Sequence, residues 1–331
     1  MILPLRWSLV ALTSLALSPL ASAEVTLQET DGTVRVEIDG KLFTEYHSKG
    51  ARRPYLYPVI GPTGAGMTRD WPLKEGTPGE EADHPHHKGL WLGHRHVNGM
   101  GFWEDSAKAG TKLGQIVHES FLEVKGGKDQ GVIRTKNNWV ADDGGELVCT
   151  DERTIRIHQL KEGRALDFDT TITAGAKDVV FGDDKDGFMA IRVAESMRLE
   201  KSKVKGEKKA PAGEGHIVLS TGAKDADAWG KKAEWCDYYG PVAGKTVGVA
   251  IFDHPKNPRH PTWWHVRSYG LFAANPFGQA QFEKLPDKNA GAFTIPAGKS
   301  VSFRYRFYFH EGDAEQGKVA DRYKEYTAQT K

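Results

Sequence analysis

Cysteine is almost missing from this chain of 331 residues, which contains only Cys149 and Cys236. Two cysteines so far apart in the sequence cannot supply the Cys-rich spacing of a structural metal site. Whether they form a disulfide or stay as two separate thiols is left open, because a bridge depends on a Cα separation that the sequence does not give.

An excess of either charge is also missing. The chain has 45 Lys and Arg residues against 44 Asp and Glu, so its formal net charge is +1. Nucleic-acid affinity rests on surplus cations that neutralise phosphates, and we therefore expect no nucleic-acid partner. The Lys-rich stretch at 201–215 is typical of a solvated surface loop.

Long hydrophobic runs are missing except near the N-terminus. There, Arg6 precedes the apolar stretch 7–17, and the small residues Ala21-Ser22-Ala23 follow it. This order is typical of a secretory signal peptide, and the run is shorter than the roughly 20 residues of a membrane-spanning helix. We expect a cleaved signal at 1–23, a mature chain at 24–331 without a membrane anchor, and a periplasmic or secreted bacterial protein.

Helical periodicity is rare, whereas alternation of apolar and polar residues is common. Residues 34–38 and 41–46 alternate on either side of Asp39-Gly40, a dipeptide typical of tight hairpins. Alternation recurs at 155–172 and 303–309, and only 314–329 has a helical pattern. The sequence predicts an all-β fold, a large antiparallel β-sandwich with a short C-terminal helix. No Pro/Ser-rich linker divides residues 24–331, which indicates one domain.

Histidine is unusually clustered. Five of the 13 histidines fall between residues 84 and 96, and three more fall between residues 254 and 265. Imidazole is a common metal ligand and the usual acid/base group near neutral pH. If residues 90–97 form a strand, His94 and His96 lie on the same face as Leu90 and Leu92. That placement predicts two imidazoles at the mouth of a pocket.

Three interpretations of this cluster compete. The first is a divalent metal site with ligands among His84, His86, His87 and His94, although the next acid, Glu104, comes too late for a cupin motif. The second is a metal-free acid/base site for a polar substrate. The third is a set of structural histidines that satisfy loop backbone. The density of the cluster favours a function, but the spacing does not distinguish metal from acid/base chemistry, so the cofactor stays open.

Aromatic and polar residues alternate around the histidines, at 54–62, 97–103 and 253–278. An acidic loop at 181–187 contains one lysine, Lys185. Flat Trp and Tyr rings stack on sugar faces, while His, Asn, Asp and Arg bind hydroxyl groups. These blocks therefore predict a cleft for a small molecule or an oligosaccharide. The oligomeric state is not predicted by any pattern in the chain.

The same blocks resemble a secreted bacterial family that carries the label methane oxygenase PmoA and is otherwise a domain of unknown function. The matching segments are PYLYPVIGPTG (54–64), TRDWP (68–72), DHPHHKGLWLGHRHVNGMGFW (83–103), FGDDKDGFMAIRVAES (181–196) and GVAIFDHPKNPRHPTWWHVRSYGLFAANPFG (248–278). The family often has Gly-Asp in place of Arg95-His96, which makes His94 a stronger candidate than His96. It often has Lys-Glu-Gly at 185–187, so the acid at Asp186 is kept. The resemblance implies a secreted domain with a site in these blocks.

The size, strand content and His-rich loops are similar to the supersandwich of galactose mutarotases, whose enzymes use a His and a carboxylate as an acid/base pair on a sugar. We expect a secreted carbohydrate-active enzyme that isomerises, eliminates or hydrolyses a glycoside or modified sugar in a His-rich cleft. The catalytic candidates are His86, His94, Asp186 and His265. The substrate-binding candidates are Arg69, His84, His87, Asn98, Lys185, His254, Asn257 and Trp264. A metal-dependent enzyme and a non-catalytic sugar-binding module are the alternatives.

Overall fold

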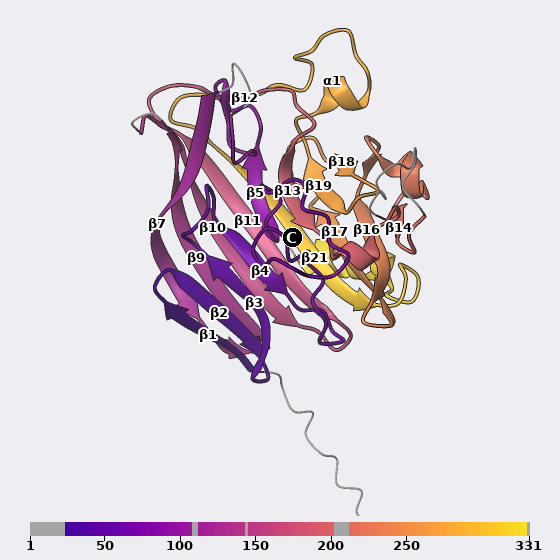
Figure 1. Ribbon diagram of the computed structural model, residues 1–331. Coiled ribbons are helices and arrows are strands. Elements are labelled where there is room, and N and C mark those ends of the chain that lie inside the picture. The colour runs from indigo at the N-terminus through magenta and orange to yellow at the C-terminus, as the bar shows by residue number, and fades with distance from the viewer. Residues whose placement is uncertain (1–23, 108–111, 143–144, 202–211, 330–331) are drawn as a thin grey trace, which may run out of the picture.

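Two large β-sheets face each other in the computed structural model, which describes residues 24–107, 112–142, 145–201 and 212–329 (Figure 1). The expected signal peptide at 1–23 and most of the Lys-rich stretch therefore lie outside the described residues. The first sheet has ten strands, in the spatial order β15 (Lys232–Ala233), β18 (Thr262–Val266), β19 (Leu271–Asn275), β13 (Gly187–Arg192), β5 (Leu90–His94), β4 (Tyr55–Val59), β3 (Lys41–His47), β2 (Thr33–Ile38), β1 (Glu24–Thr30) and β8 (Gly127–Lys128).

The second sheet has nine strands, and a pair of short strands lies apart from both sheets. The order in the second sheet is β14 (His216–Leu219), β16 (Trp235–Val242), β17 (Lys245–Asp253), β21 (Ser300–Glu311), β11 (Arg164–Ala174), β10 (Leu147–Gln159), β9 (Gln130–Ala141), β7 (Lys112–Lys125) and β6 (Met100–Gly101). The separate pair is β12 (Val179–Phe181) with β20 (Phe293–Ile295). Neighbouring strands run antiparallel except β6 and β7. The predicted class, a large antiparallel β-sandwich, is confirmed.

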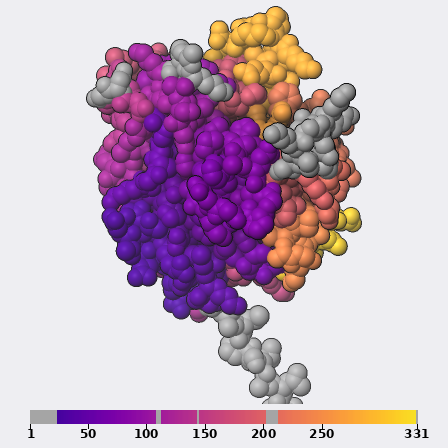
Figure 2. Space-filling model, in the orientation of Figure 1, coloured from indigo at the N-terminus to yellow at the C-terminus, as the bar shows by residue number. Residues whose placement is uncertain are grey.

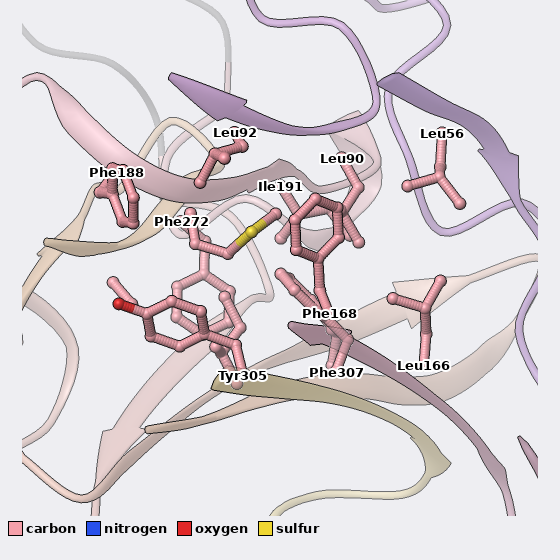
Figure 3. Close-up of a cluster of buried hydrophobic side chains, with 14 of the residues drawn as sticks. Leu56, Leu90, Leu92, Leu166, Phe168, Phe188, Ile191, Phe272, Tyr305 and Phe307 are labelled. Atoms are coloured by element: carbon pink, nitrogen blue, oxygen red, sulfur yellow. The ribbon is translucent and has the colours of Figure 1, made fainter. Parts of the chain in front are cut away.

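The main core lies between the two sheets. Leu90, Leu92 and Ile191 of the ten-stranded sheet point toward Phe168 and Phe307 of the nine-stranded sheet (Figure 3). This follows from the period-two alternation of the sequence, because every second side chain of a strand points to the same face. The predicted hairpin is also confirmed, since β2 and β3 meet at Asp39 and Gly40, which both have positive φ, as a tight hairpin turn of this type requires.

A second apolar cluster covers the opposite, outer face of the ten-stranded sheet. It consists of Tyr55, Trp91, Trp103, Ala190, Leu271 and Ala273. Strand β5 is therefore buried on both faces, and all five of its residues are buried. That explains why its sequence does not show the apolar/polar alternation of a half-exposed strand.

Within the part of the chain that the structure describes, the helices are few and short. They are the 3-10 helices η1 (Glu195–Met197) and η2 (Asp225–Ala228) and the α-helices α1 (Gln279–Phe282) and α2 (Val319–Gln329). The C-terminal helix begins at Val319 rather than at Ala314, because residues 312–318 form turns instead. Within the described residues, no helix combines the length and the apolar character needed to cross a bilayer.

The two cysteines are separate thiols. Cys149 lies in β10 and Cys236 in β16, and both are free and buried. Burial raises the pKa of both thiols above the ordinary value. They therefore pack as small apolar side chains.

Candidate active site

A row of side chains crosses the outer face of the ten-stranded sheet. Register pairs His265 of β18 with Ala273 of β19, Ala273 with Ala190 of β13, and Ala190 with Trp91 of β5. Residues directly opposite each other on neighbouring strands share a face of the sheet. Two small methyl side chains thus separate the ring of Trp91 from the ring of His265, which leaves room above the sheet.

A polar cavity of about 170 Å³ lies at this face. Its lining residues are His84, His86, His87, Arg95, Trp103, Glu104, Lys185, Asp186, Tyr269 and Leu271. They come from segments far apart in the chain, and Figure 2 shows the purple segment around residues 50–100 lying against orange segments near residue 260. A drug-sized ligand needs roughly 300 Å³ or more, so this cavity suits a smaller molecule, such as one sugar unit.

Arginines hold the histidine segment against the sheet. Arg53 donates a hydrogen bond to the backbone oxygen of His86, and Arg69 donates to the backbone oxygens of Asp83 and His84. Arg69 also forms an ion pair with the Asp83 carboxylate. Arg69 is fully buried, and its Nη1 and Nη2 atoms make these contacts. It therefore holds the histidine segment in place from beneath and does not line the cavity.

Glu104 reaches the cavity because Gly93 of β5 has no side chain. A Cβ atom at Gly93 would lie 2.5 Å from the backbone oxygen of Phe102, closer than real atoms approach. The backbone amide of Phe102 donates to the oxygen of His94 at 2.9 Å. The chain after β6 can therefore cross directly over β5 and bring Trp103 and Glu104 to the site.

The acidic loop before β13 is fixed from below. The Nε2 atom of His94 lies 2.8 Å from the Gly182 oxygen, and Asn275 donates to the backbone oxygens of Asp184 and Lys185. His94 shares a face with Leu90 and Leu92, as expected, but that face is the core. Its side chain is fully buried against Phe181 and Phe277, so His94 does not stand at a pocket mouth and acts by positioning the loop.

Strand β5 ends at His94, so the condition of a strand over residues 90–97 is met only as far as residue 94. His96 lies beyond the strand end and pairs with Asp184 at 3.3 Å. That bond is the main cause of a raised pKa for His96. At Asp184, burial opposes ionisation, but the bond to His96, the bond from the backbone amide of Asp186 and the nearby positive charges together outweigh it, and the pKa falls to about 2.

Two carboxyl groups of the cavity share Arg95. Its Nε atom lies 2.9 Å from Glu104 Oε1, and its Nη1 atom lies 2.8 Å from Asp186 Oδ2. Lys185 Nζ lies 2.7 Å from the other oxygen of Asp186. The second oxygen of Glu104, Oε2, is buried and has no hydrogen-bond partner among the described residues.

The different surroundings of Glu104 and Asp186 shift the pKa values of these two carboxyl groups in opposite directions. Burial raises the pKa of Glu104 above its ordinary value, and the nearby Asp186 and Asp184 add to this effect, against the charge of Arg95. Burial also acts on Asp186, but the charge of His265 when protonated, and the ammonium of Lys185 that bonds it, outweigh burial and lower its pKa. A pair of groups with opposite shifts is typical of an acid and a base in one site.

Three histidines of the site, His86, His87 and His265, have lowered pKa values and are neutral at neutral pH. Burial, together with the charge of Arg53, lowers the pKa of His86 to about 3. Burial lowers the pKa of His87 well below its ordinary value, with Arg192 adding to it. Burial also lowers the pKa of His265 to about 3, against the charge of Asp186, and its Nδ1 atom is buried without a partner in the described chain.

The structure thus brings together most of the predicted site residues that lie before residue 190. His84, His86, His87, Lys185 and Asp186 line one cavity. His265 lies on the same face of the sheet and is close enough to Asp186 for their charges to interact. His94 and Arg69 lie below this group.

The other four predicted residues lie elsewhere. His254 packs on Tyr326 of α2, with ring centroids 5.5 Å apart, and Asn257 bonds Asp253 and the backbone of Arg304. Asp253 and Arg304 belong to β17 and β21 of the nine-stranded sheet. Of the second histidine block, only His265 therefore lies beside the cavity, and His254 and Asn257 do not share one cleft with residues 84–94 as predicted. Trp264 is fully buried in the core, because successive side chains of a strand alternate and His265 takes the outer face.

Asn98 is the last of these four. Its side chain bonds the backbone of Asp178 at 3.1 Å and of Val180 at 2.7 Å. It thereby ties the turn after β5 to β12, and it does not line the cavity.

Five residues of the cavity were not predicted, namely Arg95, Trp103, Glu104, Tyr269 and Leu271. All five lie inside the motif segments 83–103 and 248–278 or directly after one of them. Proximity to these segments could have suggested them, but no spacing rule joins Glu104 to Asp186. Their meeting depends on Arg95 and on the glycine at 93.

A metal site was the other interpretation of the histidine cluster. Among the residues that the structure describes, no group of three or more His, Cys, Asp or Glu side chains is arranged to hold a metal ion. The rings of His84 and His87 stack in parallel with centroids 4.8 Å apart.

Comparison with known proteins identifies the family. The chain belongs to DUF6807, a family of unknown function, whose model matches residues 33–324. That description carries no methane oxygenase label. No curated protein sequence matches this chain.

Several solved structures align with most of this chain. Galactose 1-epimerase from Lactobacillus acidophilus aligns with 9% identity and a TM-score of 0.40, covering 88% of this chain and all of the other. A galactose mutarotase-like protein from Clostridium acetobutylicum aligns with 11% identity and a TM-score of 0.36, covering 88% of this chain and 99% of the other. Sequence identities and TM-scores this low assign neither a substrate nor a reaction to this chain.

Proposed function

We propose that this member of a family of unknown function is a carbohydrate-active enzyme that moves protons on one sugar unit by acid/base catalysis. Glu104 is the acid and Asp186 is the ionised base or charge-stabilising partner. The substrate is bound beside these two carboxyl groups by His86, His87 and Lys185. The reaction class is an isomerisation or an elimination, because a cavity of about 170 Å³ holds one ring rather than the two that flank a glycosidic bond.

The observation that carries this proposal is the pair of carboxyl groups on Arg95. Glu104 has one oxygen bound to Arg95 and one buried oxygen without a partner in the described chain. A buried polar atom without a partner costs free energy, and a substrate hydroxyl would supply the missing bond. The opposite pKa shifts of Glu104 and Asp186 supply a proton donor and a proton acceptor in one cavity.

This assignment differs from the sequence-based expectation, in which three of the four catalytic candidates are histidines. The imidazole of His86, with a pKa of about 3, is neutral at neutral pH. The only proton left on its ring nitrogens is a very weakly acidic N–H. The neutral rings are suited to hydrogen bonding. The carboxyl group with the raised pKa is the better acid.

The test is a comparison of Glu104→Gln and Asp186→Asn with the wild type. Each sugar of a panel of aldoses, ketoses and uronic acids is incubated with the protein in D₂O and followed by ¹H NMR, which detects both new products and exchange of carbon-bound protons. We expect each variant to lose about 100-fold to 10,000-fold in rate, the usual contribution of a general acid or base.

Glu119→Gln serves as the control, because Glu119 is exposed on β7 and pairs with Lys136. It should turn over substrate like the wild type. The proposal is wrong if both site variants keep wild-type rates. Binding of a sugar without any turnover or proton exchange would instead identify a sugar-binding module.

We also propose that the enzyme works in the periplasm or outside the cell. The sequence supports this proposal, because Arg6, the apolar stretch 7–17 and Ala21-Ser22-Ala23 follow the order of a secretory signal peptide. Expression of the full chain in a bacterium with a secretory pathway should yield a periplasmic protein whose intact mass lacks residues 1–23. A cytoplasmic protein of full mass would contradict export.

A further inference from the structure

The ring of His87 is clamped between aromatic neighbours. It stacks on His84 with centroids 4.8 Å apart and on Trp91 with centroids 5.3 Å apart. The ring edge of Trp103 meets it at 6.0 Å, and His87 is only 1% exposed. The imidazole therefore keeps one orientation, and its two nitrogens have fixed surroundings.

One of these nitrogens faces a group that can only donate. Arg192 Nη1 lies 3.2 Å from His87 Nδ1, and Arg192 Nη2 lies 3.2 Å from Asp83 Oδ1. A guanidinium has five N–H donors and no acceptor. Burial lowers the pKa of Arg192 to about 10, which still leaves it charged at neutral pH. Nδ1 of His87 must then be the acceptor, and it carries no proton.

The proton of the neutral ring is consequently on Nε2. His87 lines the cavity, and no described residue accepts a hydrogen bond from its Nε2. The Nε2–H donor of His87 is therefore held rigidly by ring stacking, and Arg192 fixes the tautomer that places the proton there. An enzyme uses such a preorganised donor where negative charge develops on a substrate oxygen.

We propose that Asp83 and Arg192 hold His87 as a neutral imidazole whose Nε2–H binds a substrate carbonyl oxygen, which makes the substrate a sugar with a free carbonyl group. This inference rests on the proposed function for its reaction and on the hydrogen-bond chain for its geometry. Asp83 and Arg192 are positioning residues, because they act on the substrate only through His87. Sugars without a carbonyl group lack the oxygen that this donor selects.

The chemical step is an enolisation. The Asp186 carboxylate takes the proton from the carbon next to the carbonyl, and the C–H electron pair forms a carbon–carbon double bond. The carbonyl π pair moves to oxygen, which becomes an enolate oxygen bound by the Nε2–H of His87. Glu104 protonates the former carbonyl oxygen, which gives an enediol. The neighbouring hydroxyl then returns a proton to Glu104 and its O–H electron pair forms the new C=O bond, while the carbon–carbon π pair takes the proton from Asp186 onto the former carbonyl carbon. The carbonyl has moved by one carbon, and atoms and electrons balance without an oxidant or a cofactor.

The tautomer is read directly by long-range ¹H–¹⁵N NMR of the uniformly ¹⁵N-labelled protein at pH 7, with His87→Gln used to assign the signals. We expect the His87 Nε2 signal at the position of a protonated ring nitrogen and the Nδ1 signal far downfield, as for a bare nitrogen. A proton on Nδ1, or on both nitrogens, overturns the proposal whatever the activity assays show. This separates its failure from that of the proposed function.

Arg192→Met then tests the positioning role, with Arg35→Met as the matched control because Arg35 lies on β2 in an exposed salt bridge. In folded Arg192→Met the two His87 nitrogen signals should move toward each other, while Arg35→Met should leave them unchanged. Unchanged His87 signals in folded Arg192→Met overturn the role of Arg192. If that variant does not fold, the wild-type spectrum still decides the tautomer.

The substrate class is tested with two probes of similar size, dihydroxyacetone and glycerol, which differ by a carbonyl group. Dihydroxyacetone should shift the His87 Nε2 signal and bind about tenfold more tightly than glycerol, the effect of one hydrogen bond. His87→Gln keeps a donor and should retain part of this preference, whereas His87→Ala should abolish it. Equal binding of both probes to the wild type overturns the carbonyl class.

Discussion

Two glycines decide where the functional side chains of this protein lie. Gly93 lets the chain that carries Glu104 cross β5, and Gly187 lies against the ring of His94. A Cβ atom at Gly187 would be 2.2 Å from His94 Nδ1. Because His94 fixes the loop that holds Lys185 and Asp186, the absence of a side chain at Gly187 is a condition for the site.

Substitution of Gly187 by alanine should therefore destabilise the protein. We expect Gly187→Ala to lower the free energy of unfolding by about 1–3 kcal/mol, the usual cost of overpacking a filled interior, and to reduce turnover because the loop moves. Urea unfolding measures the first effect. Gly175→Ala is the control, because a Cβ there would meet nothing within 4 Å, and equal stability of both variants would contradict the packing role of Gly187.

The residues of the site differ in how far the sequence predicted them. The sequence predicted five of them, because they belong to unusual local clusters, namely His84, His86, His87, Lys185 and Asp186. Glu104 was not predicted, since a single acid eight residues after a histidine fits no motif. The prediction treated the polar-aromatic block at 253–278 as one surface. Trp264 was misplaced because successive side chains of β18 point to opposite faces, and His254 was misplaced because it follows β17, which belongs to the other sheet.

At the scale of elements, a buried ion pair links strands that are not neighbours. His310 of β21 lies 3.0 Å from Asp237 of β16, and β17 runs between them. The intervening residue is Gly248, where a Cβ would lie 2.3 Å from the His310 ring. The imidazole can therefore cross over β17 and join the edge of the sheet to its interior.

The pair makes stability depend on pH in a defined direction. Burial opposes the charge of His310, but Asp237 outweighs it and raises the pKa of His310 in the folded protein. Its contribution is therefore complete below the unfolded pKa of about 6.5 and is lost as pH rises through the folded value. We expect His310→Gln to cost about 3 kcal/mol at pH 6 and less at pH 9.

Urea unfolding at the two pH values measures this difference. His216→Gln is the control, because the pair of His216 with Asp225 is largely exposed and such pairs contribute little. A cost for His310→Gln that grows from pH 6 to pH 9 would contradict a raised pKa of His310 in the folded protein.

At the scale of the whole molecule, the two sheets share one core. Leu92 and Phe272 of the ten-stranded sheet belong to the same buried cluster as Phe168 and Tyr305 of the nine-stranded sheet. Neither sheet can lose its partner without exposing this apolar face to water. The outer face with the cavity rests on the same strands, so the site depends on the integrity of the sandwich.

The protein should therefore unfold as one cooperative unit, as the prediction of a single domain over residues 24–331 requires. We expect the urea transitions followed by tryptophan fluorescence and by far-UV circular dichroism to coincide. Two separated transitions would show that the sheets, or parts of them, are independent folding units.

The sequence by itself determined the class of the fold, because the period of two that places side chains on alternate faces is a local property of the chain. It also determined the tight turn at Asp39-Gly40, because the preference of this dipeptide for positive φ is a local property as well. It also indicated that residues 84–87 and 185–186 matter, because their composition is unusual. Only the tertiary structure decided that Glu104 and Asp186 share Arg95, that His94 faces the core and that His254 does not line the cavity. Strand order and the small residues at 93, 187, 190 and 273 bring distant segments together, and neither is encoded in any short stretch of the chain.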